Sequence, residues 1–169
     1  MTIGLDRLLL HMAWANQKTI AHLQTLPEEA LNAFATNPEW HAAEIIHHIV
    51  DSGDHYAFRI SGVPALTNPG DPCIDDVKQI SDLARIMEQA AIVDRALLDC
   101  VELDDVQIEF ENYQGKQVKR WRSTILSQAI HHATEHRAQL ASALEAKGFT
   151  PVNLDDLDLW SYEIETETK

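Results

Sequence analysis

Apolar residues recur at the spacing of an α-helix in four long stretches of this chain, and this periodicity limits its fold more than any other feature. The stretches cover residues 2–26, 37–60, 76–101 and 123–148. In each stretch, apolar side chains fall on one face when residues are placed at steps of about 100°. Four amphipathic helices with one polar excursion predict an all-α fold, a four-helix bundle in which ligands converge on the core from facing helices.

Residues typical of helix ends mark the boundaries of these stretches. Pro27 closes the first, and Asn-Pro-Glu at residues 37–39 predicts an N-cap and first turn for the second. Residues 62–75 are rich in glycine and proline, which predicts a loop with tight turns. Ser123 is the expected N-cap of the last helix, and Gly148 is its expected C-terminal stop.

Two segments depart from the helical period. Residues 106–122 alternate polar and apolar side chains around Gly115, which predicts a short β-hairpin or an irregular excursion between helices three and four. Acidic residues dominate the C-terminal end, so we expect residues 161–169 to form a frayed, solvated tail after a single domain at 1–160. The acids are Asp155, Asp156, Asp158, Glu163, Glu165 and Glu167.

The charge balance limits the classes of partner. The chain has 27 acidic and 13 basic residues, a formal net charge of −14. This argues against binding nucleic acid or an anionic membrane through a basic surface. The chain shows no secretory signal or membrane-spanning run, and its two cysteines have no Cys-x-x-Cys spacing. We therefore expect a soluble, cytoplasmic protein that acts on a small molecule.

A metal site is indicated by the histidines of the fourth helix. His132 and His136 lie four residues apart, one turn along the same face, so both imidazoles can reach one ion. His136 falls on the apolar, inward face and His132 at its edge, whereas His131 points towards solvent. Two neutral imidazoles form half of a zinc- or nickel-type site, and a third ligand must come from another helix.

The second helix offers that third ligand, but periodicity leaves its identity open. His47 and His48 flank the apolar face at similar distances from its centre. A metalloprotease signature is excluded because Ala133, not glutamate, follows His132. A di-iron carboxylate site is excluded because the chain lacks a second Glu-x-x-His pair. What remains is a mononuclear three-histidine site with open positions, as in catalytic metal centres.

With these features, the chain resembles the DinB family of bacterial four-helix-bundle metalloproteins. The resemblance spans nearly the whole length and is most specific in the fourth helix, where residues 132–140 read HATEHRAQL. It also covers the Trp-Ala-Asn of residues 12–31 (MAWANQKTIAHLQTLPEEAL) and HIVDS at residues 48–52. Glu135 and Ala138 stand where the family usually has His or Tyr and Gly, departures that leave the ligand positions intact.

The resemblance implies a ligand set and a class of chemistry. Carried over position by position, the family's metal ligands fall on His48, His132 and His136, which chooses His48 over His47. The implied cofactor is a divalent metal, nickel or zinc, in a protein that is commonly a homodimer. Relatives in the wider superfamily are transferases and isomerases that use thiols such as bacillithiol, mycothiol or glutathione.

Three functions follow as hypotheses. The first is a thiol-dependent S-transferase in which the metal holds a low-molecular-weight thiol as thiolate and presents it to a small electrophile. The second is a metal-dependent hydrolase that uses metal-bound water, and the third is a metal-binding stress-response protein without turnover. No catalytic residue is assigned. By position alone, four side chains are candidates near the ligands: Asn16, Glu44, Arg137 and Gln139.

Overall fold

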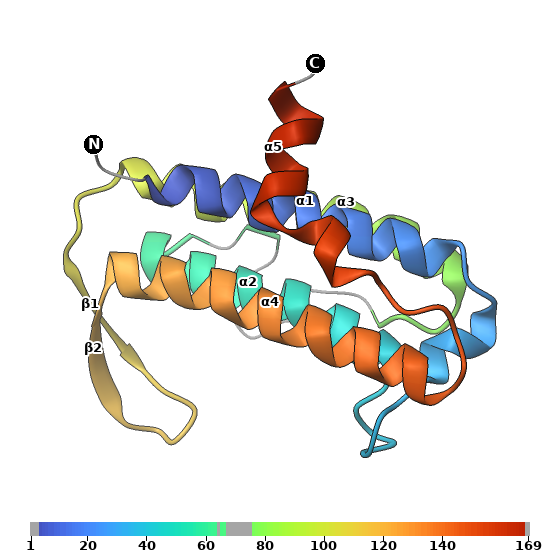
Figure 1. Cartoon of the computed structure of the whole chain (residues 1–169). Coiled ribbons are helices and arrows are strands. Elements are labelled where there is room, and N and C mark those ends of the chain that lie inside the picture. Colours follow the sequence, from blue (N-terminus) through green and yellow to red (C-terminus); the bar gives the residue numbers. More distant parts are fainter. Residues whose placement is uncertain (1–3, 64, 67–75, 168–169) are drawn as a thin grey trace.

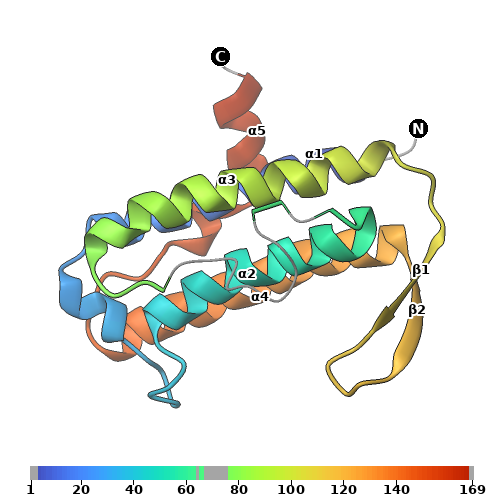
Figure 2. The same cartoon turned by 180° about the vertical axis from the view of Figure 1, so that it is seen from behind.

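The computed structural model describes residues 4–63, 65–66 and 76–167, and it confirms the all-α fold with a small hairpin. Four long helices form the bundle, α1 (Leu5–Gln24), α2 (Ala42–Ser61), α3 (Leu83–Asp99) and α4 (Arg122–Ala146). Helices α1 and α3 lie side by side over a second layer made of α2 and α4 (Figures 1 and 2). Helices α2 and α3 run in the same direction, opposite to α1 and α4 (Figures 1 and 2).

The apolar faces predicted for the four helices meet in one core. Its largest fully buried side chains come from all four helices: Leu9, Met12, Ile20, Leu23, Ile45, Ile46, Leu83, Ile86, Leu97, Leu126, Leu140 and Leu144. Gly53 lets α2 approach α3 closely, because a Cβ there would lie 2.8 Å from a methyl carbon of Val93. Burial of these faces removes apolar surface from water and fixes the rotation of α2 and α4 about their axes.

The N-terminus of α2 differs from the sequence prediction. Asn37 is not its N-cap; the Asn37 side chain accepts the backbone N–H of Glu39 in a turn. The helix begins four residues later than residue 38, and His41 is the N-cap, with its Nδ1 accepting the backbone N–H of Glu44. Asparagine before proline therefore forms a turn here instead of starting the helix. Trp40 lies in the non-helical segment 34–41 and packs against the core.

The other helix ends differ in smaller ways. Helix α3 is flanked by the 3-10 turns η2 (Ile80–Asp82) and η3 (Cys100–Glu102). The helical stretch thus begins four residues later than the predicted span of 76–101 and ends one residue beyond it. Trp121, and not Ser123 as predicted, is the N-cap of α4. The backbone N–H and the hydroxyl of Ser123 instead donate to the Asp105 carboxylate. Gly148 follows the C-cap of α4 with φ of 79°, so the predicted stop is confirmed.

The predicted hairpin is present at one end of the bundle. Strands β1 (Gln107–Glu111) and β2 (Gln117–Trp121) pair antiparallel, with Phe110 opposite Val118 and Ile108 opposite Arg120. The hairpin extends beside the start of α4 (Figure 1). Of the predicted loop at 62–75, residues 64 and 67–75 lie outside the described residues.

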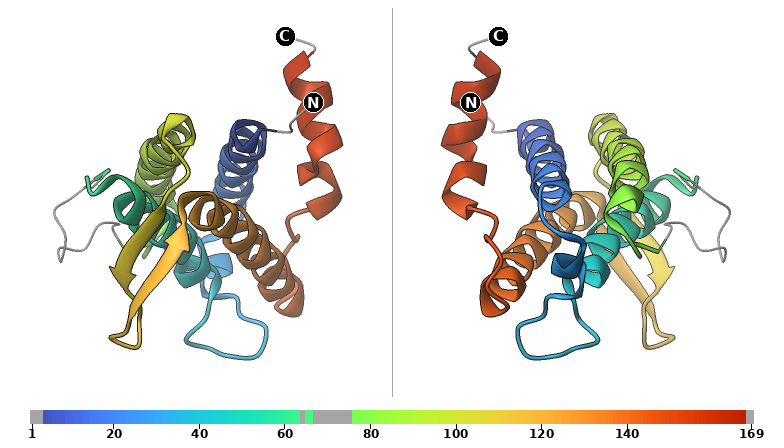
Figure 3. Two further views of the ribbon diagram at one scale, coloured as in Figure 1. Left: turned by 90° about the vertical axis from the view of Figure 1, so that its left-hand side faces the viewer. Right: turned by 90° about the vertical axis from the view of Figure 1, so that its right-hand side faces the viewer.

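The acidic end of the chain is helical where the sequence predicted fraying. The 3-10 turn η1 (Glu28–Asn32) follows α1, and the 3-10 turn η4 (Leu154–Leu157) follows α4. Helix α5 (Leu159–Glu167) comes after η4 and projects from the bundle beside α1 (Figure 3). Arg7 pairs with Glu163, and the nitrogen Nζ of Lys18 lies 2.8 Å from a carboxylate oxygen of Glu165. Basic side chains of α1 thus neutralise acids that would otherwise repel one another.

Candidate metal centre

Three histidines meet between α2 and α4, the two helices of one layer. The Nε2 atom of His132 lies 3.1 Å from Nε2 of His48 and 3.0 Å from Nε2 of His136. His132 and His136 are one turn apart on α4, and His48 faces them from α2. The ligand atoms of the three side chains all lie within 4.8 Å of one another.

Packing of α2 resolves the choice between its two adjacent histidines. His48 points to α4 and belongs to the cluster, whereas His47 does not. The remaining nearby histidines are also separate from it. His55 is exposed and lies against Asp51, and His131 is exposed, as its position on the outer side of α4 predicted. Within the described part of the chain, these three histidines are the one group of three or more such side chains placed to hold an ion.

A hydrogen-bonded pair behind the cluster orients His136. Gln139 receives the indole N–H of Trp40, with 2.8 Å between Nε1 and Oε1. Since an indole nitrogen can only donate, the amide atom that faces it must be the oxygen. The same oxygen lies 2.9 Å from Nδ1 of His136, so Nδ1 carries the hydrogen and donates it. The Nε2 atom of a neutral His136 is then bare and presents its lone pair to the cluster.

Aromatic side chains enclose the histidines on two sides. The Trp40 ring meets the rings of His48 and His136 edge-on, with centroids 5.1 and 5.5 Å apart. Tyr56 meets the His132 ring at 5.7 Å. The hydroxyl of Ser52 lies 3.4 Å from Nε2 of His48. The three imidazoles therefore occupy a half-buried, largely apolar niche with a few polar groups at its edge.

This environment favours neutral imidazoles. Burial lowers the pKa of His48, and the neighbouring His136 lowers it further. Burial also lowers the pKa of His132, to about 4, with repulsion from His136 and His48 as the next causes. The pKa values of both rings fall for the same two reasons. A positive charge on either ring is poorly solvated, and it is repelled by charge on the neighbouring rings. A neutral imidazole is the form that binds a metal ion.

Four side chains were named as candidates by position. Among the residues that the structure describes, Gln139 is the one of these four with a hydrogen bond to a histidine of the cluster. Glu44 is exposed. Asn16 and Arg137 lie in the core instead, where the Arg137 guanidinium donates to the Asn16 amide oxygen at 2.7 Å. The Asn16 amide in turn donates to Asp94 of α3 at 3.3 Å. Asn16 is therefore a hydrogen-bonded core residue.

Sequence reasoning missed two residues of this region. The first is Asp94 of α3, which is only 6% exposed. Burial raises the pKa of Asp94 to about 7, and burial lowers the pKa of Arg137 to about 10. Trp40 was also missed, because the predicted start of helix two placed it inside the helix. The signal available in the sequence was a single large apolar residue next to a helix N-terminus.

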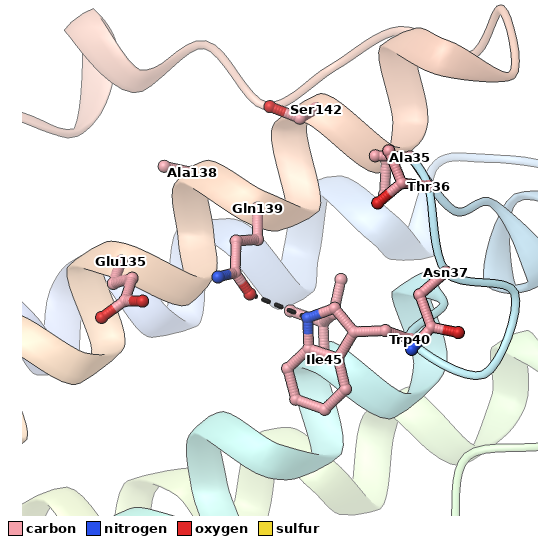
Figure 4. Close-up of a pocket in the computed structure, with 10 residues that line it drawn as sticks. Ala35, Thr36, Asn37, Trp40, Ile45, Glu135, Ala138, Gln139 and Ser142 are labelled. Atoms are coloured by element: carbon pink, nitrogen blue, oxygen red, sulfur yellow. Dashed lines mark hydrogen bonds between the residues drawn. The ribbon is translucent and has the colours of Figure 1, made fainter.

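A cavity of about 450 Å³ lies on the far side of the Trp40–Gln139 pair. Figure 4 shows Glu135, Ala138 and Ser142 on α4 along one side, with the 35–40 segment opposite. Ile45 and Ala143 complete an apolar lining. Trp40 and Gln139 line this cavity and also contact the histidine cluster, so the two spaces share one wall.

The chain was compared with known proteins. The model of the DinB family matches residues 1–168. No match is found among the curated proteins or among the solved structures. Separately, none of the helices in the described ranges combines the length and the apolar character needed to cross a membrane.

Proposed function

The chain belongs to the DinB family, and on that premise we propose that His48, His132 and His136 bind a divalent metal ion, zinc or nickel, in an enzyme that transfers thiols to small electrophiles. The observation that carries the proposal is the convergence of three ring nitrogens on one point between α2 and α4. Two nitrogens bound to one ion at about 2.0–2.1 Å, with angles of about 90–109° between them, lie about 2.8–3.4 Å apart. The two separations from Nε2 of His132, 3.0 and 3.1 Å, fit this range, and the three ligand atoms all lie within 4.8 Å of one another.

Hydrogen bonding alone does not account for the cluster. Nε2 of His136 is bare, because its Nδ1 hydrogen is committed to Gln139. Nε2 of His132 carries one hydrogen at most and lies next to two other ring nitrogens. At most one of the two close contacts can therefore be a hydrogen bond, and the other has none. A divalent ion shared by the three nitrogens would give each lone pair a partner.

Three protein ligands leave positions for an exogenous molecule. A divalent ion at this site would favour the thiolate form of a thiol, as it would favour hydroxide over water. In the proposed transfer, the thiol loses its proton to solvent, its sulfur forms a bond to the carbon of the electrophile, and the leaving group departs with the electrons of the bond that breaks. Trp40 and Tyr56 pack against the imidazoles, and Gln139 keeps His136 in the ligating tautomer.

The shared wall suggests where the electrophile lies. Trp40 and Gln139 border both the histidines and the cavity lined by Ile45 and Ala143, which is large enough for a small molecule. Apolar lining suits a weakly polar electrophile better than a charged one. We assign this cavity to the electrophile and the histidine cluster to the thiol sulfur.

Monochlorobimane with a supplied thiol tests the proposal. The zinc- or nickel-loaded protein is expected to accelerate formation of the fluorescent thioether and to lose this activity on chelation. A hydrolase would instead cleave p-nitrophenyl acetate without thiol. Loss of this ester hydrolysis on chelation would favour a hydrolase that uses metal-bound water. If the fully loaded protein does neither, the enzymatic proposal is rejected in favour of metal binding without turnover.

We also propose that the protein is a homodimer that uses the projecting end of the chain. Trp160 of α5 is 76% exposed, and Leu154 and Leu159 beside it are also exposed. Apolar side chains gathered on a projecting helix are typical of an association surface. Light scattering of the purified protein should give twice the monomer mass, and Trp160→Ser should weaken the dimer. Leu103→Ser, a matched change at an exposed leucine before the hairpin, should leave it intact.

A further inference from the structure

A second, smaller cavity lies between α2, α4 and the hairpin. Its volume is about 170 Å³, which is below the size of pockets that enclose whole drug-sized ligands. A cavity of this size holds one group of a ligand. The polar and aromatic residues that line it are Tyr56, Arg59, Phe110, Arg120, Thr124 and Gln128.

Arg120 lies on the face of the hairpin whose other residues, Ile108, Phe110 and Val118, are apolar. Residues opposite one another in an antiparallel pair share a face, so Ile108 and Arg120 lie on the same side as Phe110 and Val118. Ile108 and Phe110 pack against the bundle core, which makes this the inward face. Lys119 lies on the outer face and pairs with Glu109 across the strands. Arg120 therefore lines the cavity from an exposed position, with its guanidinium donating to the Lys119 backbone oxygen at 2.7 Å, whereas the Lys119 side chain pairs with an acid on the outer face.

Arg59 of α2 brings a second positive charge to the same cavity. Its guanidinium carbon lies 4.9 Å from the centroid of the Phe110 ring and 6.0 Å from that of Tyr56. These rings orient the guanidinium without neutralising it. In the part of the chain that the structure describes, no carboxylate forms an ion pair with Arg59 or Arg120. Two such arginines are notable in a chain with a net charge of −14.

The cavity adjoins the histidine cluster through a shared residue. Tyr56 lines the cavity and its ring contacts the His132 ring. Gln128 lines the cavity one helical turn before His132, a separation of about 6 Å along the axis of α4. A ligand a few bonds long can therefore place one end at the histidines and the other at the arginines.

We propose that this cavity binds a carboxylate of the thiol co-substrate, so that Arg59 and Arg120 select an anionic thiol and direct its sulfur to the histidine cluster. A planar carboxylate matches the paired N–H donors of a guanidinium, and Gln128 adds an amide that can donate to it. This inference rests on the proposed thiol transfer, and it adds the charge of the thiol and the residues that recognise it.

Matched thiols of equal length test the selectivity. The zinc-loaded, full-length protein is titrated by calorimetry with 6-mercaptohexanoate and with 6-mercapto-1-hexanol. We expect the carboxylate thiol to bind at least tenfold more tightly. Arg59→Gln and Arg120→Gln should each reduce this preference at least threefold, and the double variant should abolish it while still binding the neutral thiol. Competition by inorganic phosphate stronger than that by hexanoate would overturn the assignment to a carboxylate.

Lys119→Gln is the matched control, because it removes the adjacent cation from the outer face of the same strand. It should leave the preference within twofold of the parent protein. Equal loss in Lys119→Gln and Arg120→Gln would show general attraction of anions and overturn the proposal. Retained preference in the double variant would overturn it as well.

A separate measurement distinguishes failure of this inference from failure of the metal-dependent function. The metal-free protein is titrated with hexanoate while the side-chain Nε–H signals of Arg59 and Arg120 are followed by NMR. Shifts of both signals that saturate together support the carboxylate site even if the protein holds no zinc and transfers no thiol. Unchanged signals at saturating hexanoate would overturn it, whatever the metal content.

Discussion

Gln139 offers the sharpest test of how the metal centre is organised. Its amide oxygen receives the hydrogen of His136 Nδ1 at 2.9 Å and the indole hydrogen of Trp40 at 2.8 Å. Gln139→Leu keeps a side chain of similar size but removes the acceptor from both donors. His136 can then rotate or adopt the other tautomer, and it becomes a weaker base towards a metal. The variant should fold, because Gln139 lies at the edge of the core and water can reach part of it.

The expected loss follows from this geometry. Removal of the acceptor behind a ligating histidine typically lowers metal affinity by about 10–100-fold, equivalent to about 1.4–2.7 kcal/mol. Gln139→Glu retains an oxygen for both donors and makes the acceptor negative, so zinc affinity should be equal to or higher than that of the parent. The assay is competition for zinc with a chromophoric chelator at pH 7.5. Gln17→Leu, at an exposed position of α1, serves as the control.

Two results would refute this reasoning. The first is zinc binding by Gln139→Leu within twofold of the parent protein, which would mean that the hydrogen bond to His136 has no part in ligation. Alternatively, Gln139→Glu could weaken zinc as much as Gln139→Leu, which would mean that the size or neutrality of the side chain matters and its acceptor does not.

Further predictions concern the core, the histidines and the end of α4. Asn16→Leu should lower the free energy of unfolding in urea by about 3 kcal/mol or more, because it separates buried Arg137 from Asp94; a loss below 1 kcal/mol would contradict this. Since the pKa of His132 is about 4 when folded and its usual value is 6.5, the unfolded state binds more protons between these values. The metal-free protein should therefore lose stability as pH falls from 6.5 to 4, and His132→Ala should flatten this dependence in urea titrations. Gly148→Ala should cost about 1 kcal/mol, measured as a lower Tm, because alanine resists a φ of 79°.

Periodicity predicted the features that depend on one helix at a time. The inward turn of His136 and the outward turn of His131 follow from the position of the apolar face on α4, and the structure agrees. The hairpin was predictable for the same reason, because alternation over residues 107–121 is local. Gly148 as the helix stop needed only its own conformational freedom.

Features that depend on two helices were not predictable in this way. His47 and His48 sit at similar angles from the apolar centre of α2, so the rotation of α2 against α4 decides which one meets His132. Asp94 has the spacing of a surface acid and is buried because Asn16 of α1 meets it across the core. The order in α5 likewise requires basic partners from α1. Family resemblance supplied His48, where the residues of α2 alone left a choice.

Turn chemistry explains the error at the start of α2. Asn-Pro-Glu is typical of a helix N-terminus, but asparagine also closes turns by accepting the N–H two residues on, as Asn37 does from Glu39. The turn also affects the histidine cluster. It places Trp40 before the first residue of α2, where its indole N–H donates to Gln139.

The metal content of the purified protein shows whether His48, His132 and His136 bind an ion together. Elemental analysis of the parent protein after zinc or nickel loading and desalting should give one ion per chain. His48→Ala, His132→Ala and His136→Ala should each reduce this content at least tenfold, and His47→Ala, His55→Ala and His131→Ala should leave it unchanged. Retention of one ion per chain in the first set, or its loss in His47→Ala and not in His48→Ala, would contradict the account.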